Sequence, residues 1–256
     1  MSEWLGKKIL VTRDFKQSKS FCHEILMSGA QPVVIPMIEI VHEVVESDKK
    51  AIQNIFEQIE WVIFTSANGI EHFFMEFPIS QFDFGNKKFA VVGKSTEKSL
   101  HKQGFKADFI PTKYTGQCLV EEMDKYIQKD AHILFVKGKI AREVIPTYLE
   151  KEKYLYHTFT VYNTLPNQEG IQKLIQLLEN KELDVLTFTS PSTVQSFVQA
   201  LQKTSLLEKS KDWVIAVIGP TSKEKAEELG LTVSIMPEIY TLSEMLKSIQ
   251  AYFENH

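Results

Sequence analysis

Four short segments rich in Gly, Ser and Thr are the clearest candidates for a ligand-binding site in this sequence. They are TSANG at 65–69, GKST at 93–96, TSPST at 189–193 and GPTS at 219–222. Each follows an apolar run typical of a buried strand, so its N–H groups and hydroxyls would lie where a helix begins. Helix starts favour anions because their N–H groups are unpaired and the helix dipole is positive there. Ordinary capping explains any one segment equally well, but together they indicate an extended anion-binding site.

Several basic residues are expected near the same strand ends. Arg13 and Lys137 close two similar apolar runs, Arg142 follows Lys137 closely, and Lys94 lies inside one of the polar segments. An ammonium or guanidinium group in such a place can bind a carboxylate. A solvated charge at a strand end is an equally good reading of each one.

Motifs for nucleotides, metals and nucleophilic catalysis are absent from the sequence. There is no GxGxxG, no GxxxxGK[ST] and no GxSxG. The seven histidines are scattered without metal-ligand spacing, so neither a metal nor a cofactor is expected, and His72 and His157 are interpreted as surface or packing residues. Tyr162, at a predicted strand end, could donate a proton or a hydrogen bond, although a satisfied buried tyrosine explains it as well.

Apolar runs and apolar helix faces alternate along the chain. Helical periodicity predicts helices that include residues 52–59, 171–178 and 242–253. Alternating strands and helices predict an α/β fold with open, mostly parallel sheets covered by helices on both faces. The predicted strands are 9–12, 32–35, 62–65, 89–92, 133–136, 159–162, 185–189 and 214–218.

Punctuation residues support this pattern. Thr221 with Glu224, and Thr241 with Glu244, have the spacing of capping boxes at helix starts. Gly104 is expected to end a helix in the left-handed conformation, and Gly230 is its counterpart later in the chain.

The chain also contains an internal repeat. Matching blocks recur in order and at nearly constant separation, which favours two copies of one α/β plan over chance similarity. Two contiguous halves, divided near residue 129, are the simplest arrangement. The matching blocks are 9–13 with 133–137, 61–66 with 185–190, and 90–115 with 216–241.

Composition narrows the class of protein. The 256 residues have a net charge of −4 and are 43% hydrophobic, which suits a globular protein and gives no global attraction to nucleic acid. The two cysteines, Cys22 and Cys118, do not suggest a disulfide scaffold. No signal peptide or apolar membrane span is evident, so a cytoplasmic protein is expected, by default a monomer, without nucleic-acid or membrane partners.

Taken together, the motifs resemble those of the uroporphyrinogen-III synthases over essentially the whole chain. Each motif is weak alone, and their order and spacing are more specific. They are ILVTR at 9–13, FTSANG at 64–69, AVVG at 90–93, Gly138-x-x-x-Arg142, VYNT at 161–164, FTSPS at 188–192, and IGPT at 218–221 followed by Gly230-Leu231.

The resemblance implies two Rossmann/flavodoxin-like domains joined by a two-stranded β connector. It replaces the contiguous division with a discontinuous one. Residues 1–37 and 165–256 would form the first domain and 38–164 the second, with connector strands near 38–44 and 157–163.

The resemblance also implies a reaction. Hydroxymethylbilane would be cyclised to uroporphyrinogen III with loss of water and inversion of ring D, through a spiro-pyrrolenine intermediate, as a step of tetrapyrrole (haem) biosynthesis. Such a lyase needs no cofactor and works by positioning its substrate and stabilising charge. Within this reading, a transient contact with the upstream hydroxymethylbilane synthase is expected.

By position, Tyr162 matches the family's cleft tyrosine and is the catalytic candidate, assisting departure of the hydroxyl. Lys137 departs from the arginine often found at its position, so a monodentate cation would replace a bidentate one. The candidate substrate-binding residues are Arg13, Thr65, Ser66, Ala67, Asn68, Lys94, Ser95, Lys137, Arg142, Thr189, Ser190, Ser192, Gly219 and Thr221.

Two other readings are open at this stage. A two-domain glycosyltransferase of the double-Rossmann type would also use two similar domains, but its Gly-rich nucleotide-sugar loop is not evident. A non-enzymatic two-lobed anion-binding sensor would bind a small solute without turnover.

Overall fold

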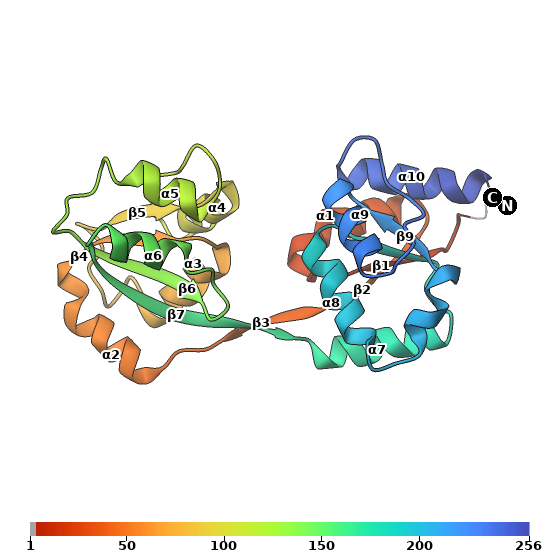
Figure 1. Ribbon diagram of the computed structural model, residues 1–256, viewed down its shortest axis with the longest axis horizontal. Coiled ribbons are helices and arrows are strands. Elements are labelled where there is room, and N and C mark those ends of the chain that lie inside the picture. Colours follow the sequence, from red (N-terminus) through yellow and green to blue (C-terminus); the bar gives the residue numbers. More distant parts are fainter. Residues whose placement is uncertain (1–3, 256) are drawn as a thin grey trace. The chain divides into compact units, whose positions relative to one another are not determined.

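The computed structural model describes residues 4–255. The chain divides into two compact units, Met1–Glu39 with Pro166–His256, and Ile40–Leu165. Each unit is an α/β layer structure with helices on both faces of its sheet (Figure 1).

The first unit has a parallel sheet in the order β2-β1-β8-β9. Its strands are β1 (Lys8–Val11), β2 (Gln31–Val34), β8 (Val185–Phe188) and β9 (Val214–Val217). Its helices are α1 (Phe15–Met27), α7 (Gln168–Glu179), α8 (Pro191–Leu201), the 3₁₀ helix η2 (Leu206–Asp212), α9 (Pro220–Glu228) and α10 (Leu242–Asn255).

The second unit has the sheet order β3-β7-β6-β4-β5, in which the pairs β7–β6, β6–β4 and β4–β5 are parallel. Its strands are β3 (Ile38–His42), β4 (Ile59–Phe64), β5 (Lys88–Val91), β6 (His132–Gly138) and β7 (Leu155–Pro166). Its helices are α2 (Glu46–Ile55), the 3₁₀ helix η1 (Phe56–Gln58), α3 (Ala67–Glu76), α4 (Lys94–Lys102), α5 (Gly116–Met123) and α6 (Val144–Lys151).

The internal repeat is visible in the topology. The matched blocks make β1 the counterpart of β6, β8 that of β4, and β9 that of β5, and these counterparts occupy the same places in the two sheet orders. Because β1 pairs with β8, a division of the chain near residue 129 does not describe the structure. The adjacent strands β3 and β7 carry the chain from one unit to the other, as expected of a two-stranded connector.

Alternate residues of each central strand enter different cores. In β4, Val62 and Phe64 belong to an aromatic-rich core with α3 and α4, whereas Trp61 and Ile63 face the core beneath α5 and α6. In β1, Leu10 faces the core of α7, α8 and α9, while its neighbours face that of α1 and α10. Strands buried on both faces must be apolar throughout, and the predicted α/β fold with mostly parallel sheets is confirmed.

Some local predictions need correction. The helix predicted over residues 52–59 ends at Ile55; Phe56 begins η1 and Ile59 begins β4, although both side chains are buried in the same core as Ile52. Thr221 does not cap a helix, because α9 begins at Pro220 with Gly219 as its N-cap.

Other local predictions hold. The Thr241 hydroxyl accepts from Glu244 N at 3.2 Å, which is one half of the predicted capping box. Gly104 and Gly230 follow helices with φ of +88° and +83°, and the predicted left-handed caps are confirmed. Within residues 4–255, none of the helices combines the length and apolar character needed to span a bilayer.

Candidate functional site

Tyr162 lies on β7 with its ring packed against the backbone of Gly138 on the neighbouring strand β6. The two residues are register partners, just beyond an irregularity that follows Lys137. A Cβ atom at position 138 would come within 2.6 Å of Tyr162 Cζ and 2.9 Å of its hydroxyl oxygen. The ring therefore occupies space that only a glycine leaves open.

The Tyr162 hydroxyl meets the start of helix α3. Ser66 is the N-cap of this helix, and its Oγ accepts a hydrogen bond from Gly69 N at 3.0 Å. The same Oγ lies 3.1 Å from the Tyr162 hydroxyl oxygen. Two residues predicted separately are thus in direct contact, and Ala67 and Asn68 form the first turn of α3 beside them.

Two histidines that sequence reasoning left out of the site form a stack that begins at Tyr162. The half-buried His72 ring stacks on the Tyr162 ring, with centroids 5.8 Å apart and planes inclined by 29°. His42 stacks on the other histidine, with centroids 5.2 Å apart. Burial, and then the charge of His42, hold the pKa of His72 below its ordinary value. No local spacing in the sequence signals this pair, because it joins β3 to α3.

A second polar loop of this unit follows the adjacent strand. Val92 N donates to Phe64 O at 3.0 Å, which brings the ends of β4 and β5 side by side. Gly93 caps α4 with φ of +86°, and Lys94 and Ser95 are in its first turn. The predicted residues of the two loops therefore lie at one edge of the sheet, where the N-termini of α3 and α4 also lie.

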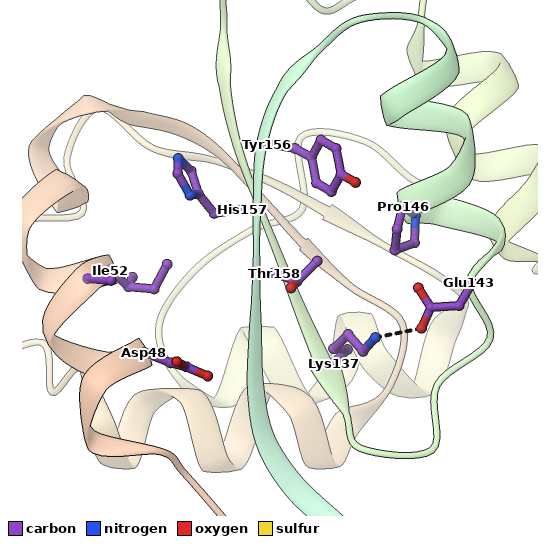
Figure 2. A pocket seen from close by; sticks show the side chains of 9 residues that line it. Asp48, Ile52, Lys137, Glu143, Pro146, Tyr156, His157 and Thr158 are labelled. Carbon is purple, nitrogen blue, oxygen red and sulfur yellow. Dashed lines mark hydrogen bonds and ion pairs between the residues drawn. The ribbon is translucent and has the colours of Figure 1, made fainter.

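Lys137, a predicted substrate cation, is paired within its own unit. Its side chain is only 13% exposed and forms an ion pair with Glu143, with 2.8 Å between Nζ and Oε1. Both residues line a pocket of about 470 Å³ along β7, and Figure 2 shows them joined beside Thr158. Arg142 is exposed in the loop before α6. Neither Lys137 nor Arg142 takes part in the contact between Tyr162 and Ser66.

The first unit repeats the capped loop. Ser190 is the N-cap of α8, accepting from Thr193 N at 3.3 Å, and its hydroxyl lies 3.0 Å from that of Ser192. Pro191 occupies the first turn of the helix, where its missing N–H carries no penalty. Within residues 4–255, Thr189 Oγ1 is buried and finds no hydrogen-bond partner.

The remaining predicted residues of this unit lie near the same edge of its sheet. Ile218 N donates to Phe188 O at 3.0 Å, so the ends of β8 and β9 are neighbours. Gly219 is buried as the extended N-cap of α9, and Thr221 is exposed in the first turn. Arg13 is exposed just past the end of β1.

A duplicated glycine–tyrosine contact also escaped sequence reasoning as a structural feature. A Cβ at Gly93 would lie 3.4 Å from the Tyr114 ring, and one at Gly219 would lie 3.2 Å from the Tyr240 ring. Both tyrosines are more than half exposed. The glycine and the tyrosine are equally spaced in the two repeats, and this spacing could have indicated the contact from the sequence.

The geometry of these loops suits the binding of anions. Capped helix starts at α3 and α8, each beside a second loop, offer N–H groups and hydroxyls to carboxylates. Ser66 contacts the Tyr162 hydroxyl, and Gly138 and His72 pack against its ring. Across residues 4–255, no cluster of three or more His, Cys, Asp or Glu side chains suited to a metal ion is found.

Comparisons with known proteins agree with one another. The family model described as uroporphyrinogen-III synthase HemD matches residues 21–247. The uroporphyrinogen-III synthase of Chlorobaculum parvum is 30% identical over 250 residues, which cover 95% of this chain and 98% of that protein. The porphyrin biosynthesis protein HemD of Ruminiclostridium josui is 29% identical over 249 residues; these cover 95% of this chain but 48% of that longer protein.

A solved structure shows the same fold. The crystal structure of a mutant uroporphyrinogen III synthase from the extremely thermophilic bacterium Thermus thermophilus aligns with a TM-score of 0.65 at 14% identity, covering 98% of this chain and all of that one. The family match extends over most of the sequence and the fold agrees with it. This chain belongs to the uroporphyrinogen-III synthase family, the cyclising lyases of porphyrin biosynthesis.

Proposed function

We propose that this chain converts hydroxymethylbilane to uroporphyrinogen III, with Tyr162 assisting departure of the hydroxyl group. The observation that carries the proposal is the contact between Ser66 Oγ and the Tyr162 hydroxyl. Family membership supplies the reaction class, while this contact supplies a group suited to its first step. Neither a glycosyltransferase nor a non-enzymatic sensor is favoured by the family match.

The hydrogen bonds around Ser66 suit proton donation by Tyr162. Ser66 Oγ already accepts from Gly69 N, so its own proton can be directed at the tyrosine oxygen. The tyrosine proton then remains available for a ligand. In the proposed step the substrate C–O bond breaks, the Tyr162 proton joins the departing hydroxyl to form water, and the pyrrole nitrogen's electron pair stabilises the cation left behind.

Ring closure then follows from positioning. The cationic methylene is attacked by the substituted α-carbon of ring D, giving the spiro-pyrrolenine. The older bond at that carbon then breaks and leaves a methylene cation on the preceding ring. The unsubstituted α-carbon on the other side of the ring D nitrogen attacks this cation and loses its proton, which leaves ring D inverted. Direct closure without inversion is the competing route. Catalysis therefore depends on holding the chain ends, which suits strand-end loops that present mainly N–H groups and hydroxyls.

The strand-end loops are the proposed anchors for the substrate, whose pyrrole rings all carry carboxylate side chains. In the second unit these are Ser66, Asn68 and Ser95 at the starts of α3 and α4. In the first unit Ser190 and Thr221 have the corresponding places at α8 and α9. Thr65, Ala67, Lys94, Thr189, Ser192 and Gly219 complete the proposed loops.

The cations have a more limited proposed role. Arg13 and Arg142 are not fully buried and can reach a carboxylate at little cost in lost contacts. Lys137 would first have to leave Glu143. We therefore propose that Lys137 contributes less to binding than the two arginines do.

The deciding experiment uses the purified chain with freshly generated hydroxymethylbilane. The uroporphyrin isomers are separated after oxidation, beside an enzyme-free control. Predominant isomer III without added metal or nucleotide is expected. Isomer I alone, formed at the control rate, would remove the synthase activity from this chain.

We further propose a cytoplasmic monomer that contacts the upstream hydroxymethylbilane synthase transiently. Cys22 and Cys118 are free thiols, which suits a reducing compartment. Light scattering during size-exclusion chromatography tests the monomer, and a dimer mass would contradict it. Faster formation of isomer III from coupled enzymes than from added substrate would support the transient contact, and equal rates would count against it.

A further inference from the structure

A short chain of polar side chains runs behind Tyr162 and involves three elements. The Nδ1 atoms of His42 and His72 are 3.0 Å apart. His42 Nε2 lies 2.7 Å from Glu76 Oε1, and the other carboxylate oxygen lies 2.6 Å from Lys49 Nζ. His72 in turn stacks on Tyr162, so the chain ends at the proposed catalytic residue.

The hydrogen bonds restrict where protons can be. A carboxylate only accepts, so His42 Nε2 carries a proton and donates it to Glu76. With His42 neutral, its Nδ1 is an acceptor and His72 Nδ1 is the donor. When His42 gains a proton, the roles reverse, and His72 must carry its proton on Nε2. One added proton thus changes the tautomer of the ring that lies against Tyr162.

A second added proton would break the pair. Two imidazolium rings would direct N–H groups at each other across 3.0 Å and repel one another. Burial and the neighbouring His42 already lower the pKa of His72, which favours a single shared proton. Glu71 on the same helix acts in the opposite direction, favouring the charged ring.

Charged groups on α2, on α3 and in the segment after β3 surround the pair. Burial raises the pKa of Glu76, but its bonds to Lys49 and His42 outweigh this and hold it ionised below its ordinary value. Glu46 on α2 also faces Lys49. Glu43, next to His42 on the chain, accepts hydrogen bonds from Lys139 Nζ and, at 2.9 Å, from Asn163 Nδ2. The His42–Glu76 contact is therefore the main anchor of the pair.

We propose that His72 is a positioning residue for Tyr162, and that His42 and Glu76 determine which of its ring nitrogens carries the proton. The proposal rests on the proposed function, since Tyr162 is assigned its role there. When the two rings together carry at most one added proton, the His72 ring stays against the tyrosine. When both rings are imidazolium ions, their repulsion releases it. Activity should then fall as the pH decreases below the ordinary histidine value of 6.5.

The kinetic test replaces His72 by phenylalanine, which keeps an aromatic ring beside Tyr162 but cannot donate, accept or titrate. The H72F variant is expected to lower kcat about tenfold at neutral pH, since small misplacements of a reacting group are costly, and to lose the acid-side decrease of the wild type. H42F is expected to lose the same acid-side decrease in activity. A wild-type kcat and pH profile in both variants would overturn the proposal.

The matched control is H101F. His101 is exposed and pairs with Glu97 across one helical turn at 3.9 Å, so H101F also loses a histidine–carboxylate pair. It lies in the last turn of α4, whereas the proposed site is at the N-terminus of that helix. Its profile is expected to follow the wild type. If H101F also lost the acid-side decrease in activity, that decrease could not be attributed to the His42–His72 pair, and the proposal would fail.

A spectroscopic readout separates this proposal from the synthase reaction. Nitrogen-15 spectra of the imidazole rings report tautomers without substrate. A change of His72 from the Nδ1–H to the Nε2–H form as His42 gains a proton is expected, also in Y162F. Independent titration of the two rings with an unchanged His72 tautomer would overturn the proposal, whereas absence of isomer III with the coupled change would remove only the proposed function.

Discussion

The Tyr162 ring lies against Gly138 so closely that any side chain at 138 would overlap it, with 2.6 Å between an added Cβ and Cζ of the tyrosine. The contact joins neighbouring strands, β6 and β7, at a point where their register shifts. The strands thus place the tyrosine hydroxyl within 3.1 Å of Ser66 Oγ. A glycine in one strand decides where a functional group of the next strand points.

The first prediction concerns Gly138. Replacing it with alanine must displace the Tyr162 ring, because the clash involves atoms of the ring itself. We expect kcat to fall about tenfold or more, with a loss of about 1–3 kcal/mol in the free energy of unfolding from overpacking. Steady-state kinetics and urea unfolding measure the two effects.

Gly85→Ala is the control for Gly138→Ala. Gly85 is exposed, and its added Cβ would approach only the flexible Asp83 side chain, at 3.1 Å. Its kinetics should match the wild type. An unchanged kcat in the Gly138 variant would mean that the tyrosine's exact place does not matter to the reaction.

The second prediction separates the two roles of Ser66. Ser66→Ala removes both the cap of α3 and the contact with Tyr162, so it should destabilise the fold by about 1 kcal/mol and also lower kcat. Thr115→Ala removes a comparable cap, since Thr115 accepts from Cys118 N at 3.2 Å at the start of α5. It should show the stability loss alone.

Tyr162→Phe completes this comparison. It should lower kcat several-fold or more with little change in unfolding, because the ring and its packing remain. Equal kcat values in Tyr162→Phe and the wild type would show that the hydroxyl takes no part in the reaction. A kcat loss in Thr115→Ala as large as in Ser66→Ala would attribute both to stability.

Much of the fold follows from the sequence because strands buried on both faces must be continuously apolar. The runs at 62–65 and 133–136 fall almost entirely within β4 and β6. The helix predicted over 52–59 shows the limit of periodicity. Phe56 and Ile59 are apolar because they reach the same core as Ile52, but they do so from a 3₁₀ turn and a strand.

The site is less accessible to sequence reasoning. Ser66 stands out as a candidate cap, but its contact with Tyr162 joins residues 96 positions apart and depends on the register of strands between them. The His42–His72 pair spans 30 positions with no motif to mark it. Lys137 stands at the predicted strand end, yet only the structure shows that its ammonium group forms an ion pair with Glu143. Side-chain pairing across elements is what the sequence does not encode locally.

The third prediction tests whether the start of α8 binds a carboxylate. Asn and Asp cap helices about as well as Ser, so Ser190→Asn and Ser190→Asp should unfold alike. Only Asp adds a negative charge where an anion is proposed to bind, and its KM should be roughly tenfold above that of the Asn variant, about 1.4 kcal/mol.

Salt should reduce this difference in KM between the Ser190 variants, because exposed charges are screened at high ionic strength. Kinetics at low and high salt provide the measurement. Equal KM values for the Asn and Asp variants at low salt would show that Ser190 acts as a cap alone.

The last prediction concerns Glu76 and pH. The folded-state pKa of Glu76 is below its ordinary value of 4.5, because bonds to Lys49 and His42 outweigh the effect of burial. A carboxyl with a lowered folded pKa stabilises the fold above the unfolded value and loses that contribution as the pH falls through the folded one. Glu76→Gln should therefore be less stable than the wild type by about 1–2 kcal/mol at neutral pH, and the difference should shrink as the pH falls below 4.5.

Urea unfolding of the wild type and Glu76→Gln across this pH range measures the difference. Glu228→Gln is the control, since Glu228 is 64% exposed and pairs with Lys225 on the surface of α9. Such a pair contributes about 0–1 kcal/mol, so its variant should stay close to the wild type at every pH. A Glu76→Gln difference that persisted undiminished in acid would mean that the lost interaction does not depend on the ionised carboxylate, and that Glu76 holds its partners by packing.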